Sequence, residues 1–393
     1  MAEWKKVRLG QIIKTNVDSY SSRDNWSFVN YLDTGNITMN KVDDIQYIDL
    51  KSEKLPSRAK RKVKHNSILY STVRPNQLHY GIVKKQPANF LVSTGFTVID
   101  VMDNAAVPDF IYYLLTQKEV TEHLQAIGEQ SVSAYPSIKP TDIENLEVII
   151  PDIEAQKRIA SILVAIDRKI KENEQINNNL EQQAQALYKA WFVDFEPFGG
   201  TKPSNWQKSD IYSVANIIYG APFSSKLFNT EGLGKPIIRI RDLKEQAFIT
   251  YTTEVHPKGH LIQPGDIVVG MDGEFRPYLW GNTEAWLNQR VCIFENKNSN
   301  DKAFVLFSIK PLLNVIEQTQ VATTVIHIGK KDYDTFEILL PDRKTLDDFG
   351  TITAPMINQI VNNCLENKHL VSLRDTLLPR LMSGELDVSD IDL

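Results

Sequence analysis

Cationic and amide side chains in the first part of the chain have the types and spacing that suit contacts with nucleic acid. A basic tract at residues 54–65 comes directly before residues 67–76, which we expect to form a strand that ends in polar side chains. Cations suit phosphate positioning, whereas Arg, Asn and Gln side chains can read base edges. An isolated basic tract is more simply a solvated loop, but the polar strand end beside it favours DNA. The candidate DNA-binding residues here are Lys60, Arg61, Lys62, Lys64, Arg74, Asn76, Gln77, Tyr80, Ser93 and Thr94.

The second part of the chain repeats this combination. In residues 236–241, Pro-Ile-Ile-Arg-Ile-Arg, arginines alternate with isoleucines, so a strand here would have one apolar face and one basic face. Further polar and aromatic residues lie in or after turn-rich segments at 264–275 and 287–293. The DNA-binding candidates of this part are Arg239, Arg241, Arg276, Tyr278, Asn288 and Arg290.

Catalytic motifs are largely missing from the sequence. There is no Walker-type ATP loop, no Gly-x-Gly-x-x-Gly after a strand, and no Asn-Pro-Pro-Tyr-like or Asp-Pro-Pro-Tyr-like tetrapeptide. Asp266, Asp272 and Glu274 could hold a metal ion for phosphodiester cleavage, but a turn built on Asp-Gly explains them better. The histidines lack ligand spacing, and Cys292 and Cys364 are too few for a metal cluster. The sequence therefore predicts no catalytic residue and no metal site.

Two long helices are the elements expected to position these candidates. Residues 151–198 carry a seam whose steps alternate between four and three, which is the period of a coiled coil. A helix from about 153 to 191 would be about 60 Å long. The stretch recurs 190 residues later, where Phe-Glu-Ile-Leu-Leu-Pro-Asp at 336–342 matches Leu-Glu-Val-Ile-Ile-Pro-Asp at 146–152. The repeat predicts a second long helix that could pair with the first.

Asparagines recur at matching seam positions, Asn173 and Asn177 in the first helix and Asn363 and Asn367 in the second. An Asn in a coiled-coil core costs stability but fixes register, because its amide seeks another amide. If the helices run antiparallel, Asn173 faces Asn367 and Asn177 faces Asn363. The simpler alternative leaves each Asn on a hydrated part of its helix. Pro355 predicts a kink in the second helix, or a helix that begins near it.

Composition bounds the class of protein. The chain of 393 residues is too long for one ordinary core, and 42% apolar with 24% charged residues is typical of a soluble globular protein. The net charge of −5 does not by itself indicate a nucleic-acid binder, so the local basic patches carry that inference. No apolar run of about 18 residues and no signal-peptide core are present, so we expect a cytoplasmic protein with no membrane partner.

The order of these features predicts a mixed α+β protein built as a tandem. We expect a globular α/β domain at 1–150, a long helix at 151–198, a second globular α/β domain at 199–340, and a second long helix with a tail at 341–393. Residues 108–125 should form one helix of the first domain. The two long helices should pair as an antiparallel coiled coil with pseudo-two-fold symmetry.

Several motifs resemble the specificity subunits of type I restriction-modification enzymes. The long-helix motifs are Ala-Leu-Tyr-Lys-Ala-Trp-Phe-Val-Asp-Phe-Glu-Pro at 186–197, Pro-Asp at 151–152 before Gln-Lys-Arg-Ile-Ala at 156–160, and Leu-Pro-Arg-Leu-Met-Ser-Gly-Glu-Leu at 378–386. Within the globular parts, Ser-Thr-Gly-Phe at 93–96, Met-Asp-Gly-Glu-Phe at 271–275 and Leu-Asn-Gln-Arg at 287–290 resemble family patterns. The resemblance spans nearly the whole chain, although Thr-Leu-Asp-Asp at 345–348 departs from the usual Gln-Lys-Arg-like face.

This resemblance implies two target-recognition domains held apart by the helices, each reading half of a split site in double-stranded DNA. It also implies two modification subunits that dock on the helices and carry S-adenosylmethionine for adenine methylation, with ATP-dependent restriction subunits joining later. The chain itself would bind no cofactor and have no active site. The alternatives are a nuclease that dimerises through the coiled coil and a non-catalytic protein adaptor. Missing catalytic motifs count against the nuclease, and duplicated basic strand faces count against the adaptor.

Overall fold

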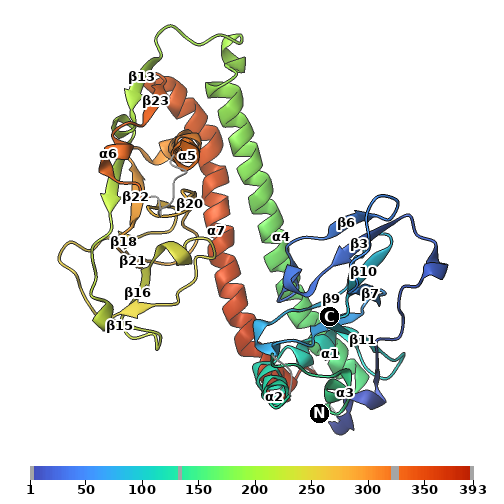
Figure 1. The fold of residues 1–393 in the computed structure, drawn as a ribbon. Helices are drawn as coiled ribbons and strands as arrows, with labels where there is room; N and C mark the ends of the chain where they lie inside the picture. Colours follow the sequence, from blue (N-terminus) through green and yellow to red (C-terminus); the bar gives the residue numbers. More distant parts are fainter. Residues whose placement is uncertain (1–3, 132–134, 320–326, 390–393) are drawn as a thin grey trace. The chain divides into compact units, whose positions relative to one another are not determined.

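The chain folds into two compact units that share two long helices (Figure 1). The structure is a computed structural model and describes residues 4–131, 135–319 and 327–389. The first unit comprises Met1–Asp167 with Ser372–Leu393, and the second comprises Arg168–Val371. This division passes through both long helices, which the sequence analysis had placed in segments of their own.

The first unit is built from short strands and a few helices around the start of the first long helix. It contains a four-stranded sheet in the order β6-β3-β10-β7, a four-stranded sheet in the order β2-β11-β8-β9, and the two-stranded sheets β1-β12 and β4-β5. The elements are β1 (Lys5–Arg8), β2 (Ile13–Thr15), β3 (Phe28–Leu32), β4 (Ile37–Thr38), β5 (Lys41–Val42), β6 (Gln46–Asp49), β7 (Ala59–Lys62), β8 (Ile68–Ser71), β9 (Tyr80–Ile82), β10 (Phe90–Ser93), β11 (Phe96–Val101), α1 (Pro108–Leu115), α2 (Lys118–Glu129), α3 (Pro140–Glu144) and β12 (Glu147–Ile150).

The second unit repeats this plan. It has a five-stranded sheet in the order β15-β17-β16-β21-β18, a four-stranded sheet in the order β14-β22-β19-β20, and the pair β13-β23. The elements are β13 (Gln207–Asp210), β14 (Ala215–Tyr219), β15 (Phe228–Asn229), β16 (Lys235–Ile238), β17 (Tyr251–Thr252), β18 (Leu261–Ile262), β19 (Ile267–Gly270), β20 (Pro277–Leu279), β21 (Ala285–Leu287), β22 (Val291–Asn296), α5 (Lys302–Thr319), α6 (Lys330–Tyr333) and β23 (Glu337–Leu340).

One parallel strand pair stands in each unit within a sheet whose other pairings are antiparallel. In the first unit β10 runs parallel to β3, and in the second β16 runs parallel to β21. The strand order of the other four-stranded sheet and the pairing of the first with the last strand also recur. The tandem of globular parts predicted from the sequence repeat is therefore confirmed.

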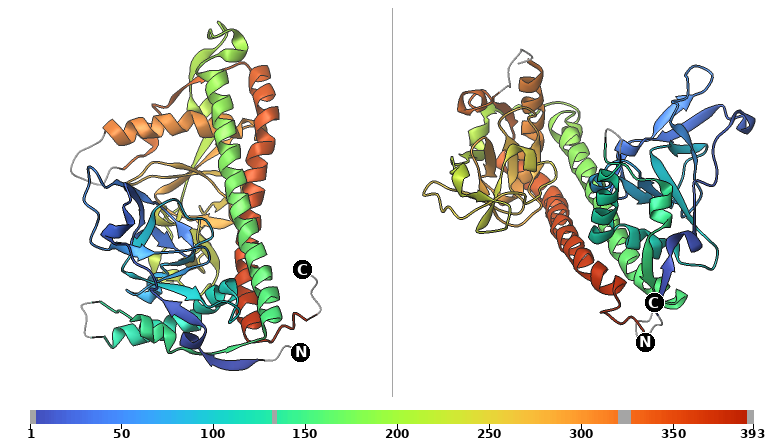
Figure 2. Two further views of the ribbon diagram at one scale, coloured as in Figure 1. Left: turned by 90° about the vertical axis from the view of Figure 1, so that its right-hand side faces the viewer. Right: turned by 60° about the horizontal axis from the view of Figure 1, so that its bottom comes forward.

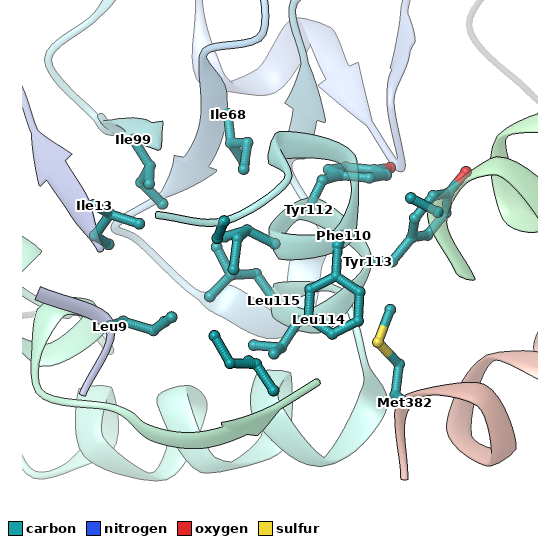
Figure 3. Packing of buried hydrophobic residues seen from close by; sticks show 14 of the residues in the cluster. Leu9, Ile13, Ile68, Ile99, Phe110, Tyr112, Tyr113, Leu114, Leu115 and Met382 are labelled. Atoms are coloured by element: carbon teal, nitrogen blue, oxygen red, sulfur yellow. The ribbon is translucent and has the colours of Figure 1, made fainter. Parts of the chain in front are cut away.

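The core of the first unit is completed by the end of the chain. Met382 lies beside Phe110 and Tyr113 of α1 in the same apolar cluster (Figure 3). Gly384 has φ +77°, and a Cβ added there would lie 2.8 Å from the Trp4 ring, so glycine is required for this close approach. Residues about 380 positions apart in sequence thus form one core.

Aromatic rings at the end of the first long helix fill the core of the second unit. The ring of Phe192 lies 4.8 Å from that of Phe349 and 5.0 Å from that of Phe304. Phe198 and Trp206 follow at 4.9 Å. The aromatic motif at 186–197 therefore has a packing role, since edge-to-face contacts of this kind add to the burial of apolar area.

The long helices, α4 (Ile153–Phe192) and α7 (Arg343–Met382), each have 40 residues and run side by side through the second unit (Figure 2). Asn173 Nδ2 donates to Asn367 Oδ1 at 2.8 Å, and Asn363 Nδ2 donates to Asn177 Oδ1 at 2.8 Å. The partner on α7 moves from residue 367 to residue 363 as the residue on α4 moves from 173 to 177. The two helices are therefore antiparallel. Both Asn pairs that the repeat predicts are thus in contact, and Asn173 and Asn363 are buried.

Two local predictions are wrong, and one alternative of a third is excluded. Residues 108–125 form two helices, α1 and α2, because the chain is not helical at Thr116 and Gln117. The strand predicted at 236–241 ends at Ile238, and residues 240–242 form a 3₁₀ turn. The second long helix begins at Arg343 and continues through the exposed Pro355, so it does not begin near that proline, which was one of the two predicted alternatives. Proline has no N–H, so Pro355 cannot donate a hydrogen bond to the carbonyl of Thr351 in the preceding turn. Because Thr351 is exposed, water can hydrogen-bond to this carbonyl instead.

Candidate nucleic-acid interface

The strand β7 forms the middle of the basic tract of the first unit, and the cations of the tract differ in whether they already have a partner. Lys60 is exposed, and the structure gives its ammonium group no partner among the described residues. Lys62 instead donates to Asp24, lies 3.8 Å from Asp18, and holds the pKa of Asp24 below its ordinary value by that hydrogen bond. Lys64 is exposed at 3.6 Å from Asp100. Lys62 therefore holds the loop that contains Asp18 and Asp24 against β7, whereas Lys60 is available to bind a phosphate group.

Arg61 lies between these lysines on β7. It is half-buried, and its Nε makes no hydrogen bond within the described part of the chain. Its backbone bridges to Ser19, so the tract is held against the loop that Lys62 also anchors. Arg61 is thus part of the sheet rather than a freely extended cation.

The polar end predicted after the strand at 67–76 is a strained turn rather than a strand. The strand β8 stops at Ser71, and Arg74 has φ +48° at the start of a 3₁₀ turn over Pro75–Gln77. The Arg74 guanidinium lies 4.6 Å from the centre of the Tyr135 ring, a cation–π distance. Asn76 and Gln77 are exposed on the same turn.

Two candidates of the first unit are buried, so their side chains are not on the surface of the structure. Tyr80 is 5% exposed, with its ring 5.9 Å from that of Tyr70, and burial raises its pKa to about 12. The side chain of Ser93 is fully buried at the end of β10. Thr94, the next residue, is half-buried, and its backbone nitrogen donates to the carbonyl of Arg58 at 2.8 Å. Periodicity could not reveal this burial, because both faces of these strands are covered.

In the second unit, two of the predicted cations are already paired with carboxylates. Arg276 forms a two-pronged contact with Glu317 of α5, which raises the pKa of the guanidinium. Arg290 has φ +69° and lies 3.7 Å from Asp272. Both side chains are therefore oriented by the protein. Tyr278 is half-buried on β20.

The remaining candidates of the second unit gather at one end of the parallel strand pair. Arg239 follows β16 and Asn288 follows β21, so both lie at the carboxyl end of these strands. Arg241 is exposed two residues further on, while Asn288 is buried. The structure adds Asp242 and Thr250 to this group, which the sequence analysis missed. The carboxylate that follows the alternating arginines was the available signal for Asp242.

The described residues contain neither a group of possible metal ligands nor a helix that could span a membrane. Across residues 4–131, 135–319 and 327–389, no three His, Cys, Asp or Glu side chains come together in a way that would hold a metal ion. Asp266 accepts a hydrogen bond from the backbone of Gln263 at 2.7 Å, so it closes a turn. No helix in these ranges is long and apolar enough to cross a bilayer.

Comparison with known proteins gives a match along most of the chain. The family model for the type I restriction modification DNA specificity domain matches residues 1–182 and 203–365, which include both globular parts. The HindI specificity subunit of Haemophilus influenzae is 26% identical over 462 residues, covering 98% of this chain and all of that protein. The EcoBI specificity subunit of Escherichia coli is 35% identical over 138 residues, which is 35% of this chain and 29% of that protein.

A solved structure has a similar fold. The S subunit of a type I restriction-modification system from M. genitalium superposes with a TM-score of 0.61 at 15% identity, covering 97% of this chain and 96% of that one. At this identity the likeness concerns the fold alone. It agrees with the tandem of globular parts and long helices.

Proposed function

The chain belongs to the family of type I restriction-modification DNA specificity subunits, and from this premise we propose that it reads a bipartite DNA target with a fixed gap. One unit reads each half of the target. The duplicated sheet plan, with a parallel strand pair and polar side chains in both units, is the observation that carries this proposal. Two equivalent readers on one chain fit a target of two separate halves.

The long helices would act as the spacer and the scaffold of the complex. We propose that α4 and α7 form an antiparallel coiled coil with pseudo-two-fold symmetry. The hydrogen-bonded Asn pairs support this pairing, and Arg374 Nη1 adds a bond to Asp167 Oδ1 at 2.9 Å, less than two turns before Asn173 on α4. Polar pairs at such seams define one register, because other registers bury an amide without a partner.

The chemistry of methylation would belong to other subunits. We propose that two modification subunits dock on the long helices and supply S-adenosylmethionine, and that restriction subunits join this complex in the cytoplasm. A hollow on α4 near its end, lined by Gln183, Leu187, Lys189, Ala190 and Asp194 among others, is a surface for such docking. In this proposal the chain selects the DNA sequence and performs no reaction itself.

Methylome sequencing of host DNA tests this function directly. With the gene and its modification partner present, adenine methylation should mark a split motif, and deletion of this gene should abolish that motif alone. The purified chain should bind DNA weakly and gain sequence-specific binding when modification subunits are added. Methylation that persists without the gene, or methyl transfer by the isolated chain, would overturn the proposal.

A further inference from the structure

The carboxyl end of the β16–β21 pair forms a polar cluster that the basic-tract argument does not explain. Register pairs Ile238 with Leu287, so the next residues, Arg239 and Asn288, are neighbours at the same end of parallel strands. The backbone nitrogen of Asn288 donates to the carbonyl of Ile238 at 3.3 Å. Parallel pairing thus places two polar side chains from distant parts of the sequence next to each other.

A buried carboxylate lies beneath this end of the sheet. The Asp242 side chain has no exposed area, and its Oδ2 accepts a hydrogen bond from the Arg239 backbone at 3.0 Å. Arg239 Nε lies 3.8 Å from Asp242 Oδ2, and Arg241 Nε lies 3.6 Å from Asp242 Oδ1. A charged group without solvent is costly unless it is paired, so the two guanidinium groups stabilise Asp242 and are fixed by it.

The arginines are held differently by their surroundings. Arg239 Nη2 donates to the buried Thr250 Oγ1 at 2.6 Å, and its guanidinium lies 5.9 Å from the Phe228 ring. Only 28% of the Arg239 side chain is exposed, compared with 62% for Arg241. Arg241 contacts Asp242 through Nε, and most of its side chain is exposed, so its guanidinium can donate to a further partner.

This end of the sheet contains buried polar atoms that make no hydrogen bond in the described part of the chain. Arg239 Nε, Asp242 Oδ1 and Asn288 Oδ1 all lack a hydrogen bond within the described residues, because the ion-pair distances of 3.8 Å and 3.6 Å at Asp242 are too long for one. Buried polar atoms are almost always satisfied in folded proteins. Arg239 and Asn288 are neighbours at one strand end, and Asp242 is hydrogen-bonded to the Arg239 backbone, so the three atoms belong to one polar cluster that a docking ligand would complete.

The same place in the first unit is also polar but has different residues. There Leu32 pairs with Val92, which brings Asp33 and Ser93 together at the carboxyl end of β3 and β10. The hydroxyl of Tyr31 donates to Asp33 Oδ1 at 3.2 Å. A fixed scaffold with changed side chains at one place is what two readers of different half-sites require.

We propose that the carboxyl end of the β16–β21 pair is the base-reading site of the second unit, where the exposed Arg241 contacts a base edge in the major groove and Asp242 is a positioning residue that orients Arg241. This inference rests on the proposed function. An Arg held at Nε can donate its remaining N–H groups to the two acceptors of guanine.

The test uses the chain in complex with its modification subunits, with the wild-type split motif as reference. Asp242→Asn keeps the shape of the side chain and removes its charge. It should lower discrimination at one base pair of one half-site about tenfold, while the other half-site and the gap stay unchanged. Arg241→Gln should relax the same base pair. The double variant should lose no more than Arg241→Gln alone, because Asp242 acts through Arg241.

Asp301→Asn is the matched control, because Asp301 is also buried and pairs with an arginine, Arg343, away from this site. It should lower the melting temperature without changing base preference. The inference is overturned if Asp242→Asn weakens binding to all sequences alike, or if this variant still recognises the unchanged motif. A fall in the salt dependence of binding on Arg241→Gln also overturns it, because it would identify a phosphate contact. If Asp242→Asn does not fold, the exposed Arg241 still carries the test. A wild-type complex without any split motif would instead overturn the proposed function.

Discussion

At the scale of single residues, neighbouring lysines of the basic tract have different roles. Lys60→Gln should weaken binding to all DNA sequences alike and reduce the slope of log affinity against log salt by about 1, because one phosphate contact is lost. Lys62→Gln should leave that slope unchanged and lower the melting temperature of the chain, since Lys62 is bonded to Asp24. Salt titrations of the complex and thermal unfolding of the chain separate the two effects.

The Lys62 contact also predicts a dependence on pH. The pKa of Asp24 is lowered in the folded chain from an ordinary value of 3.8, chiefly by the hydrogen bond from Lys62. A depressed carboxyl pKa contributes stability above the ordinary value, and this contribution is lost as pH falls through the lowered one. The melting-temperature difference between wild type and Lys62→Gln should therefore be full at pH 7 and shrink below about pH 4. A difference that grows in acid would contradict this assignment.

The Asn pairs between the long helices can be tested by a double-mutant cycle. Asn177→Ala or Asn363→Ala should each lower the free energy of unfolding by about 1–3 kcal/mol, because each leaves a half-buried or buried amide without its partner. The double variant should cost less than the two losses added together, by about 0.5 kcal/mol or more. The exposed Asn178→Ala is the control and should change stability by less than about 0.5 kcal/mol. Strict additivity would show that the pair is not coupled.

At the scale of elements, the sequence predicts long-range order better than local detail. In residues 151–198 the apolar residues repeat with a helical period over many turns, which indicates a long helix. The structure has this helix at Ile153–Phe192. Short segments carry too few residues for that. Residues 236–241 alternate like a strand, but the hydrogen bond of Asp242 to the Arg239 backbone turns the chain after Ile238. Such a side-chain bond has no periodic signature.

Burial was equally hidden in the sequence for the candidate site. Tyr80 and Asn288 are polar residues near basic segments, so their composition indicated an exposed surface. In the structure both are buried: the Tyr80 ring packs against Tyr70 of β8 and Tyr112 of α1, and Asn288 follows β21 where that strand pairs with the distant β16. Pairing between distant strands decides which polar residues face a partner, and one sequence does not reveal that pairing.

The helix α7 offers a further test, because it continues through Pro355. Pro355→Ala should raise the free energy of unfolding by up to about 3 kcal/mol, since alanine restores the missing backbone hydrogen bond and fits the helix interior. Pro311→Ala in α5 is the matched change elsewhere in the same unit. Stabilisation at Pro311 without stabilisation at Pro355 would show that α7 requires its proline for packing. The DNA target should be the same in both variants.

At the scale of the whole molecule, the segment that follows each long helix packs into the core of one unit. The chain end after α7 packs into the first unit, where Leu381, Met382 and Val388 are buried. Residues after α4 pack into the second unit, where Phe192 and Trp206 are buried. Each long helix therefore belongs to both units and fixes both of its ends by packing. This packing at both ends of each helix supports the proposed spacer role.

Lengthening both helices together tests the spacer role. Seven seam-preserving residues inserted after Asp167 in α4 and after Ser372 in α7 fall near the division between the units. They leave the Asp167–Arg374 bond on one side and the Asn173–Asn367 bond on the other. The insertion adds about 10 Å to each helix, which is about three base pairs at roughly 3.4 Å each. Methylome sequencing should show both half-sequences unchanged and separated by a gap about three base pairs longer. The same insertion in α4 alone mismatches the helices and should abolish specific binding rather than lengthen the gap. A folded, active double-insertion variant with the original gap would show that the helices do not set the spacing.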